Sequence, residues 1–245
     1  MVGRRDFVGT RVRPAIWIAV VASLVSVSAL SVVTALNSEP KVFFVRASGD
    51  TTLSTFFADE PMGRDDTLWL TAADGELNWS LVSFNLAGQL RPGDLIREAR
   101  VQFHVVTSQG TAFPATIVTG RLLKSFSEAS TTWDTKPLMG FDTRTATIVK
   151  APPEPGAGIW IDVSKQLHRW HSYGGPSNFG TVLQLITDSA LQLNGTAGAS
   201  LGLASRENVD YQMPRIQISY APGPPSLYGY LVESGIADLA MARFE

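Results

Sequence analysis

The chain has 245 residues, of which 44% are hydrophobic and 17% charged, and its formal net charge is -2. This composition is typical of a folded globular protein and excludes a disordered one. The near-neutral charge provides no electrostatic basis for binding nucleic acid. The sequence contains no cysteine, which excludes disulfides, thiolate metal sites, cysteine nucleophiles and a lipid-modified cysteine.

Residues 1–40 are predicted to be a signal peptide or a transmembrane anchor. The first fourteen residues carry four arginines, and the following Ala15–Leu36 is apolar and uncharged. This run is long enough to span a bilayer at about 1.5 Å per residue, and it exceeds the roughly 7–15 residues of a usual signal core. Ala29 and Ala35 offer cleavage positions, and Arg4-Arg5 resembles a twin-arginine export motif. Cleavage of this segment as a signal peptide and its retention as an anchor both stay open. In both cases the remainder of the chain is exported.

Residues 41–220 show a strand pattern throughout. About ten short apolar or alternating segments are separated by turn residues. The predicted strands are Val42–Ala47, Thr67–Thr71, Asn78–Leu86, Glu98–Val106, Thr116–Lys124, Thr145–Lys150, a short strand from Gly158, Thr181–Thr187, Ala199–Ser205 and Arg215–Tyr220. Many short strands with little helix predict an all-β fold, a two-sheet antiparallel β-sandwich.

Two irregularities interrupt this pattern. Ser48–Asp50 follows the first β-rich run, and these turn residues are predicted to end that strand. Leu81 and Val82 are adjacent apolar residues in a segment that otherwise alternates, which is consistent with a β-bulge.

The stretch Gly158–Trp170 is predicted to be a short strand that continues into a short helix. Asp162 suits the N-cap position, and Leu167 and Trp170 have the i, i+3 spacing of one helix face. Trp160 is expected to be part of the apolar core. Because so short a helix is unstable alone, we expect it to pack against the sandwich.

Residues 221–245 are predicted to be a tail outside this domain. The Pro/Gly-rich Ala221–Pro225 ends the strand pattern, and Ser226–Glu245 has helical spacing of apolar residues. A short helix and a loosely docked tail are both compatible with this spacing.

Motifs spread along residues 41–220 match one known family in a single order. They are Asp50, Thr67–Leu70, Ser80–Leu86, Glu128, Thr132-Trp133, Pro137, Trp160–Trp170, Asn178–Gly180, Ser205, Glu207 and Pro214–Tyr220. The chain thereby resembles a DNRLRE domain, which is similar to carbohydrate-binding module family 96. The resemblance implies a β jelly roll. It also implies an extracellular, non-catalytic module that binds acidic polysaccharide such as alginate, or a surface protein built on that fold.

Two positions depart from the family pattern. Trp79 and Met213 stand where the family often has arginine. If those arginines belong to a ligand or ion-pair site, this chain has lost it. No catalytic domain is recognisable beside the module, which favours a free-standing role at the surface.

Outward-facing aromatic and basic side chains are the candidate ligand contacts. Aromatic faces stack on sugar rings, and Arg and Lys pair with uronate carboxylates. The aromatic candidates are Trp69, Trp79, Tyr173 and Tyr211, and the basic candidates are Arg100, Lys124, Arg206 and Arg215. The competing interpretation is that single exposed aromatic residues are ordinary surface.

Asp50 and Asp162 are the candidate ligands of a structural calcium ion. Jelly-roll modules often hold calcium where the first strand meets a late one. For Asp162 we favour the N-cap interpretation. His168 and His171 could reach one metal ion, but zinc requires three or four ligands, so we expect them to be surface residues covering a sheet edge.

No motif for enzyme chemistry is present: the sequence contains neither GxSxG, HExxH nor a P-loop. Glu128, Asp134 and Glu207 are too generic to indicate a glycosidase pair, and Glu128 is expected to hydrogen-bond within its own loop. The sequence therefore predicts an exported, envelope-anchored, non-catalytic module that binds polysaccharide. The alternative is a structural subunit of a cell-surface layer or filament, whose partners would be other surface proteins.

Overall fold

The computed structural model describes residues 39–73, 75–91, 93–172, 178–187 and 198–223. Among these residues there are eleven strands and one helix, and no helix is long and apolar enough to cross a membrane. The predicted anchor of residues 15–36, Tyr173 and the predicted tail of residues 226–245 lie outside the described residues.

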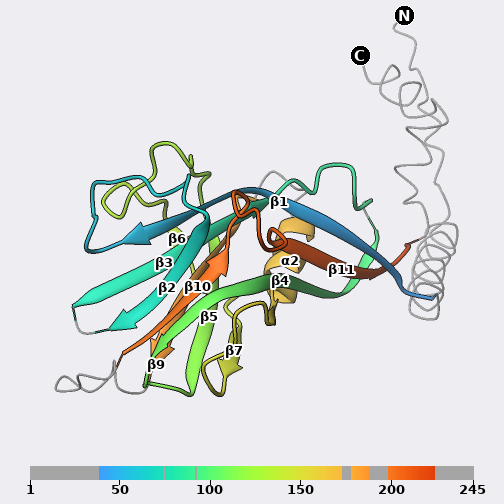
Figure 1. The fold of residues 1–245 in the computed structure, drawn as a ribbon. Coiled ribbons are helices and arrows are strands. Elements are labelled where there is room, and N and C mark those ends of the chain that lie inside the picture. The colour runs from blue at the N-terminus through green and yellow to red at the C-terminus, as the bar shows by residue number, and fades with distance from the viewer. Residues whose placement is uncertain (1–38, 74, 92, 173–177, 188–197, 224–245) are drawn as a thin grey trace, which may run out of the picture.

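Each of the ten predicted strands is present, some with longer and some with shorter bounds, and the two-residue strand Met139–Gly140 was not predicted. Figure 1 shows their arrangement. The elements are β1 (Lys41–Ser54), β2 (Thr67–Ala73), β3 (Glu76–Phe84), β4 (Leu95–Gly110), β5 (Ala115–Leu122), β6 (Met139–Gly140), β7 (Ala146–Val149), β8 (Gly158–Asp162), α2 (Ser164–Ser172), β9 (Thr181–Thr187), β10 (Ala199–Ala204) and β11 (Arg215–Ala221).

All described strand pairs are antiparallel. The hydrogen-bonded order is β1-β11-β4-β10-β2-β3-β9-β5-β6, with β7 beside β5 and β8 beside β4, and β1 also pairs with β3. The β1–β3 pairing brings the path back on itself, so that the strands enclose a common core. The prediction of an all-β antiparallel fold with one short helix is confirmed, and the arrangement is consistent with a sandwich.

Strand β1 passes from one neighbour to another along its length. Its first part pairs with β11 and its second part pairs with β3, with a register shift between Ala47 and Gly49. The predicted end of the strand at Ser48–Asp50 is therefore wrong. These residues form a bulge inside a continuous strand, because the chain changes partner there without leaving the sheet.

Leu81 and Val82 are fully buried on opposite faces of β3. Val82 belongs to the main core, whereas Leu81 belongs to a second cluster with Leu53, Leu122 and Val182. No register shift occurs between the two residues, so the predicted bulge is wrong. The alternation fails because both faces of this strand are covered, which replaces the usual in-out pattern with a continuous apolar run.

Helix α2 closes the core as predicted. Leu167 and Trp170 are each 1% exposed and pack into the main core. Asp162 Oδ1 accepts hydrogen bonds from the backbone N–H of Ser164 (2.8 Å) and from its hydroxyl (2.6 Å), so Asp162 stabilises the start of the helix. Trp160 is half-buried and belongs to neither core cluster, so the expectation that it adds to the core is wrong.

Candidate functional site

A pocket of about 470 Å³ lies where the ends of five strands meet. A volume of this size is typical of pockets that bind small ligands. The pocket is lined by Ser54, Phe57, Met62, Trp69, Thr71, Ala73, Glu76, Asn78, Gln109, Gly110, Gly198, Ala199 and Ser200. Apart from Phe57 and Met62, which precede β2, these residues lie at the ends of β1 and β4, the start of β3, the start of β10 and along β2.

A row of polar side chains crosses the pocket at right angles to the strands. Paired residues on neighbouring strands share one face of a sheet. The register places in one row, from β4 to β10, β2, β3 and β1, the residues Gln109, Ser200, Thr71, Asn78 and Ser54. The pocket floor is therefore a band of hydroxyl and amide groups, which sequence order alone does not bring together.

Hydrogen bonds link the middle of this polar row. The Asn78 amide nitrogen donates to Glu76 Oε1 (2.7 Å) and to Thr71 Oγ1 (3.0 Å), and the hydroxyls of Thr71 and Ser200 are 2.8 Å apart. Asn78 is 6% exposed, and its Oδ1 has no hydrogen-bond partner. Leaving a buried acceptor without a partner carries a desolvation cost.

Apolar side chains border the polar row. Trp69 is half-buried and lies on β2 between the inward-facing Leu68 and Leu70, so its indole faces away from the core, as predicted. Phe57 is 43% exposed and contributes a second aromatic ring. A face that combines aromatic rings with hydroxyl and amide groups is suited to binding sugars.

Two hydroxyl groups fix the backbone that carries Trp69. The Trp69 N–H donates to Thr52 Oγ1 (3.0 Å), and the Ser80 hydroxyl donates to the Trp69 carbonyl (2.9 Å). Both hydroxyl-bearing residues are fully buried. Trp69 lies in the part of β2 that does not pair with β3, so these two side-chain hydrogen bonds hold its backbone. These buried contacts thereby set the position of the indole.

The loop that carries Phe57 and Met62 rests on a second loop. The Asp134 N–H donates to the Ala58 carbonyl (3.1 Å). Gly63 lies against the backbone of Glu128, since a Cβ at this position would be 2.4 Å from the Glu128 carbonyl oxygen. Only glycine allows so close an approach. The contact between Gly63 and Glu128 thereby helps to hold the loop that forms the apolar wall of the pocket.

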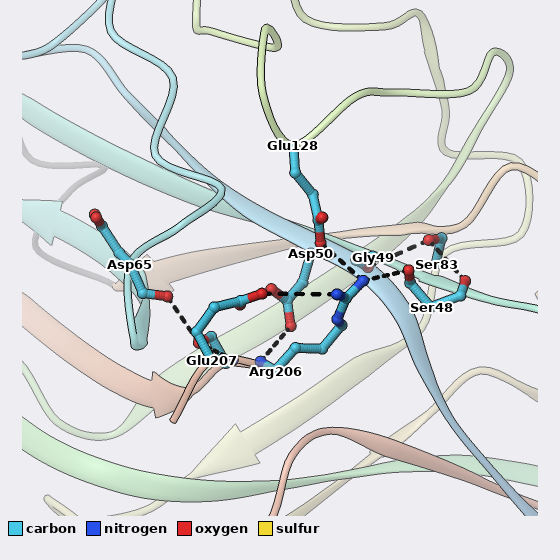
Figure 2. Close-up of polar contacts among 9 residues, drawn as sticks. Ser48, Gly49, Asp50, Asp65, Ser83, Glu128, Arg206 and Glu207 are labelled. Carbon is cyan, nitrogen blue, oxygen red and sulfur yellow. Dashed lines mark hydrogen bonds and ion pairs between the residues drawn. The ribbon is translucent and has the colours of Figure 1, made fainter. Parts of the chain in front are cut away.

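A cluster of charged residues joins the loop that contains Glu128 to β1 and to the loop after β10 (Figure 2). Glu128 Oε1 accepts a hydrogen bond from the Asp50 N–H (2.7 Å) and pairs with Arg206 Nη1 (3.2 Å). Arg206 also lies 3.7 Å from Glu207 Oε1 and donates to the Ser48 carbonyl. The prediction that Glu128 bonds within its own loop is therefore wrong, because its carboxylate points across to β1 and the loop after β10.

Asp50 is the most deeply buried acid of this cluster. It is 1% exposed, and burial raises the pKa of its carboxyl to about 7. The Arg206 backbone N–H, which donates to Asp50 Oδ2 (2.9 Å), opposes that rise in pKa, while the nearby Glu207 and Glu128 add to it. The Arg206 guanidinium is the nearest positive charge, so the cluster holds three acids against one cation.

The described residues do not fit the predicted calcium site. Asp50 contacts Glu128 and Arg206, whereas the carboxylate of Asp162 is engaged by Ser164, so no contact joins the two candidate ligands. Among the described residues, no group of three or more His, Cys, Asp or Glu is placed to hold a metal ion. The positive charge that the acids require comes from Arg206.

The two histidines of α2 lie at its surface. His168 is exposed, and a ring nitrogen of His171 is 3.0 Å from the Asp94 carbonyl oxygen. Both are surface residues, as expected, and His171 contacts the segment before β4.

Of the seven candidate ligand contacts that lie among the described residues, only Trp69 lines the pocket. Trp79 packs on Trp133 with ring centroids 4.8 Å apart, in the second apolar cluster. Arg100 pairs with Glu98 on an exposed part of β4. Arg215 bonds to Gln102 Oε1 (2.8 Å) and lies over the Phe44 ring.

Two further candidates also lie away from the pocket lining. Lys124 is exposed just after β5. Tyr211 is half-buried; its N–H bonds to Asn208 Oδ1 (2.8 Å), and its ring lies near Gly156.

No protein-family model matches this chain, and no curated protein matches it. The functional argument therefore depends on the site itself.

The sequence pattern did not predict the polar half of the pocket. Thr71, Asn78, Ser200 and Gln109 are ordinary strand residues in the linear chain, and their spacing carries no signal for a common site. Only the strand register aligns them. Phe56 and Phe57 are adjacent aromatic residues in an otherwise polar segment, and both are exposed. This pair was the one signal in the sequence for the apolar wall of the pocket.

Proposed function

We propose that this protein is an exported, envelope-anchored, non-catalytic module that binds polysaccharide at the cell surface. The observation that carries the proposal is the pocket in which Trp69 and Phe57 border a five-strand polar row. The resemblance of residues 41–220 to the DNRLRE domain and to carbohydrate-binding module family 96 supports the same function and a jelly-roll topology.

The position of the pocket in the fold supports a surface role. Lys41 pairs with Tyr220, which pairs with Ile96 near the start of β4, and the pocket lies at the other end of β4, where Gly110 pairs with Ala199. Figure 1 shows β1 and β11 side by side at the end away from the β2–β3 hairpin. With sixteen residues, β4 spans about 50 Å at about 3.3 Å per residue. An anchor preceding Lys41 would thus hold the pocket away from the membrane.

Titration calorimetry with sugar oligomers tests this proposal. Binding to the purified full chain should weaken at least tenfold in Trp69→Ala, since the stacking surface is removed. Phe44→Ala is the matched control, because Phe44 is also an exposed aromatic residue but lies at the β1–β11 end. Melting curves of both variants establish that the fold is retained. Equal affinity of Trp69→Ala and the parent protein would refute binding at the pocket.

The alternative role, a structural subunit of a surface layer or filament, is favoured by one feature of β1. Among the described strands, the first part of β1 pairs only with β11, which leaves its other edge open, and Val42 and Phe44 are about half exposed there. An open strand edge with apolar side chains can accept a strand from a second chain.

Light scattering and electron microscopy of the purified protein distinguish this alternative. Assembly through β1 should produce concentration-dependent oligomers that Phe44→Lys abolishes. A protein that stays monomeric at high concentration would count against assembly and would leave glycan binding as the function.

A further inference from the structure

The charge of the pocket differs from that expected for a site that binds acidic sugars. Among the described residues that line the pocket, Glu76 is the single charged one, and none is Lys, Arg or His. A uronate chain carries one carboxylate on every ring and requires cationic partners in its site. The basic residues proposed for that task, Arg100, Lys124 and Arg215, are not among the lining residues.

One acceptor of the polar row lacks a donor, but this atom is buried below the accessible surface of the pocket. Both N–H groups of the Asn78 amide are used by Glu76 and Thr71, which leaves Asn78 Oδ1 without a partner in a side chain that is 94% buried. Glu76 adds carboxylate oxygens on the same side. Sugar hydroxyls can donate to the Glu76 carboxylate, whereas a uronate carboxylate has no proton to donate at neutral pH and is repelled by Glu76.

The row is long and continuous. Neighbouring strands are about 4.8 Å apart, so the four steps from Gln109 to Ser54 span about 19 Å. Trp69 and Phe57 stand beside this band. The shape is suited to an extended chain of several sugar rings that lies across the strands, with ring faces on the aromatic groups and hydroxyls on the row.

From these observations we infer that the pocket selects an uncharged, hydroxyl-rich sugar chain over a uronate chain. This rests on the proposed function, and it replaces the acidic ligand that the family resemblance implies. Selection arises from the Glu76 carboxylate and from a described lining without cationic side chains, which together favour ligands that donate hydrogen bonds and disfavour ligands that carry negative charge.

The test compares two probes of equal length on the purified full chain, a β-1,4-linked glucose hexamer and a mannuronate hexamer, at physiological salt. Only the part of the binding that Trp69→Ala abolishes is counted, because the arginines near the N-terminus can attract a polyanion elsewhere. We expect the glucose hexamer to bind through the pocket at least tenfold more tightly than the mannuronate hexamer.

Glu76→Gln identifies the origin of the selectivity. It keeps the Oε1 acceptor for Asn78 and removes the charge, so the difference between the two hexamers should shrink at least threefold, mainly through tighter mannuronate binding. Glu98→Gln is the matched control, since Glu98 is on β4 and does not line the pocket, and it should leave both affinities unchanged.

The outcomes separate the inference from the function on which it rests. Trp69-dependent binding of mannuronate that equals or exceeds that of glucose would overturn the inference and leave polysaccharide binding intact. Binding of neither hexamer through Trp69 would overturn both. A preference for glucose that Glu76→Gln does not change would overturn the role of the pocket charge.

Discussion

The backbone N–H of Arg206 donates a hydrogen bond of 2.9 Å to Asp50 Oδ2, across 156 residues of sequence. The bond ties the loop after β10 to the middle of β1, and Glu128, which lies between these two segments in the sequence, accepts a hydrogen bond from the Asp50 N–H. Three segments that are remote in the chain therefore meet at one buried carboxyl (Figure 2). The same Glu128 backbone supports the loop that forms the apolar wall of the pocket.

The first prediction concerns the pH dependence of stability. The pKa of Asp50 is raised by burial from 3.8 to about 7. Between these values the folded protein holds a proton that the unfolded chain has released, so the free energy of unfolding should fall as pH rises from 4 to 7. For one group the slope is at most about 1.4 kcal/mol per pH unit, and it vanishes above pH 7.

Urea unfolding of the parent protein and of Asp50→Asn across this pH range isolates that contribution. The variant keeps an acceptor for the Arg206 N–H and cannot ionise, so it should be less dependent on pH than the parent. Asp134→Asn, at an exposed position, is the control and should follow the parent. Parallel curves for the parent and Asp50→Asn would show that Asp50 titrates alike in both states.

The second prediction compares two arginines. Arg206→Met should lower the free energy of unfolding by about 1–3 kcal/mol, because it leaves Glu128 and Glu207 without their cation beside the buried Asp50. Arg100→Met should cost less than about 1 kcal/mol, since the Arg100–Glu98 pair is half exposed to solvent. Chemical denaturation measures both, and equal costs would contradict the structural role of the cluster.

The third prediction concerns a glycine at the pocket rim. Gly110 has a φ of +95°, and a Cβ there would lie 2.1 Å from the Gly198 carbonyl oxygen. Gly75 has a φ of +75° with no atom within 4 Å of the added Cβ. Gly75→Ala should therefore cost only the backbone strain of about 1–2 kcal/mol, and Gly110→Ala should cost more because backbone must also move. Thermal unfolding ranks the two, and the reverse order would contradict the geometry.

The fourth prediction compares two tryptophans of one segment. Trp170→Ala should destabilise the protein by about 3–5 kcal/mol, because the side chain is 1% exposed and its removal leaves a cavity in the main core. Trp160→Ala should cost clearly less, since Trp160 is half-buried and outside both core clusters. If the two variants unfold at the same denaturant concentration, α2 does not close the core in the way described.

Local pattern predicted most of the fold. The alternation of Val101, Phe103 and Val105 and the spacing of Leu167 and Trp170 follow the periods of a strand and a helix, and all five residues are buried in the core. Where local pattern failed, at Ser48–Asp50 and at Leu81-Val82, the cause was a neighbour remote in sequence. Ser48–Asp50 forms a bulge and not a turn, because β1 changes its pairing partner there from β11 to β3. Leu81 and Val82 are both apolar because a second apolar cluster covers the other face of β3.

The sequence by itself determined the class of fold and the outward direction of Trp69, because both depend on the two-residue repeat of a strand. Only the tertiary structure decided which polar residues share the pocket with Trp69 and which carboxylate is buried beside Arg206. Strand register aligns Gln109, Ser200 and Thr71 in one row, and register is set by the packing of the whole sheet. A pairing shifted by one residue would turn each of these side chains to the opposite face, so the site exists only in the folded chain.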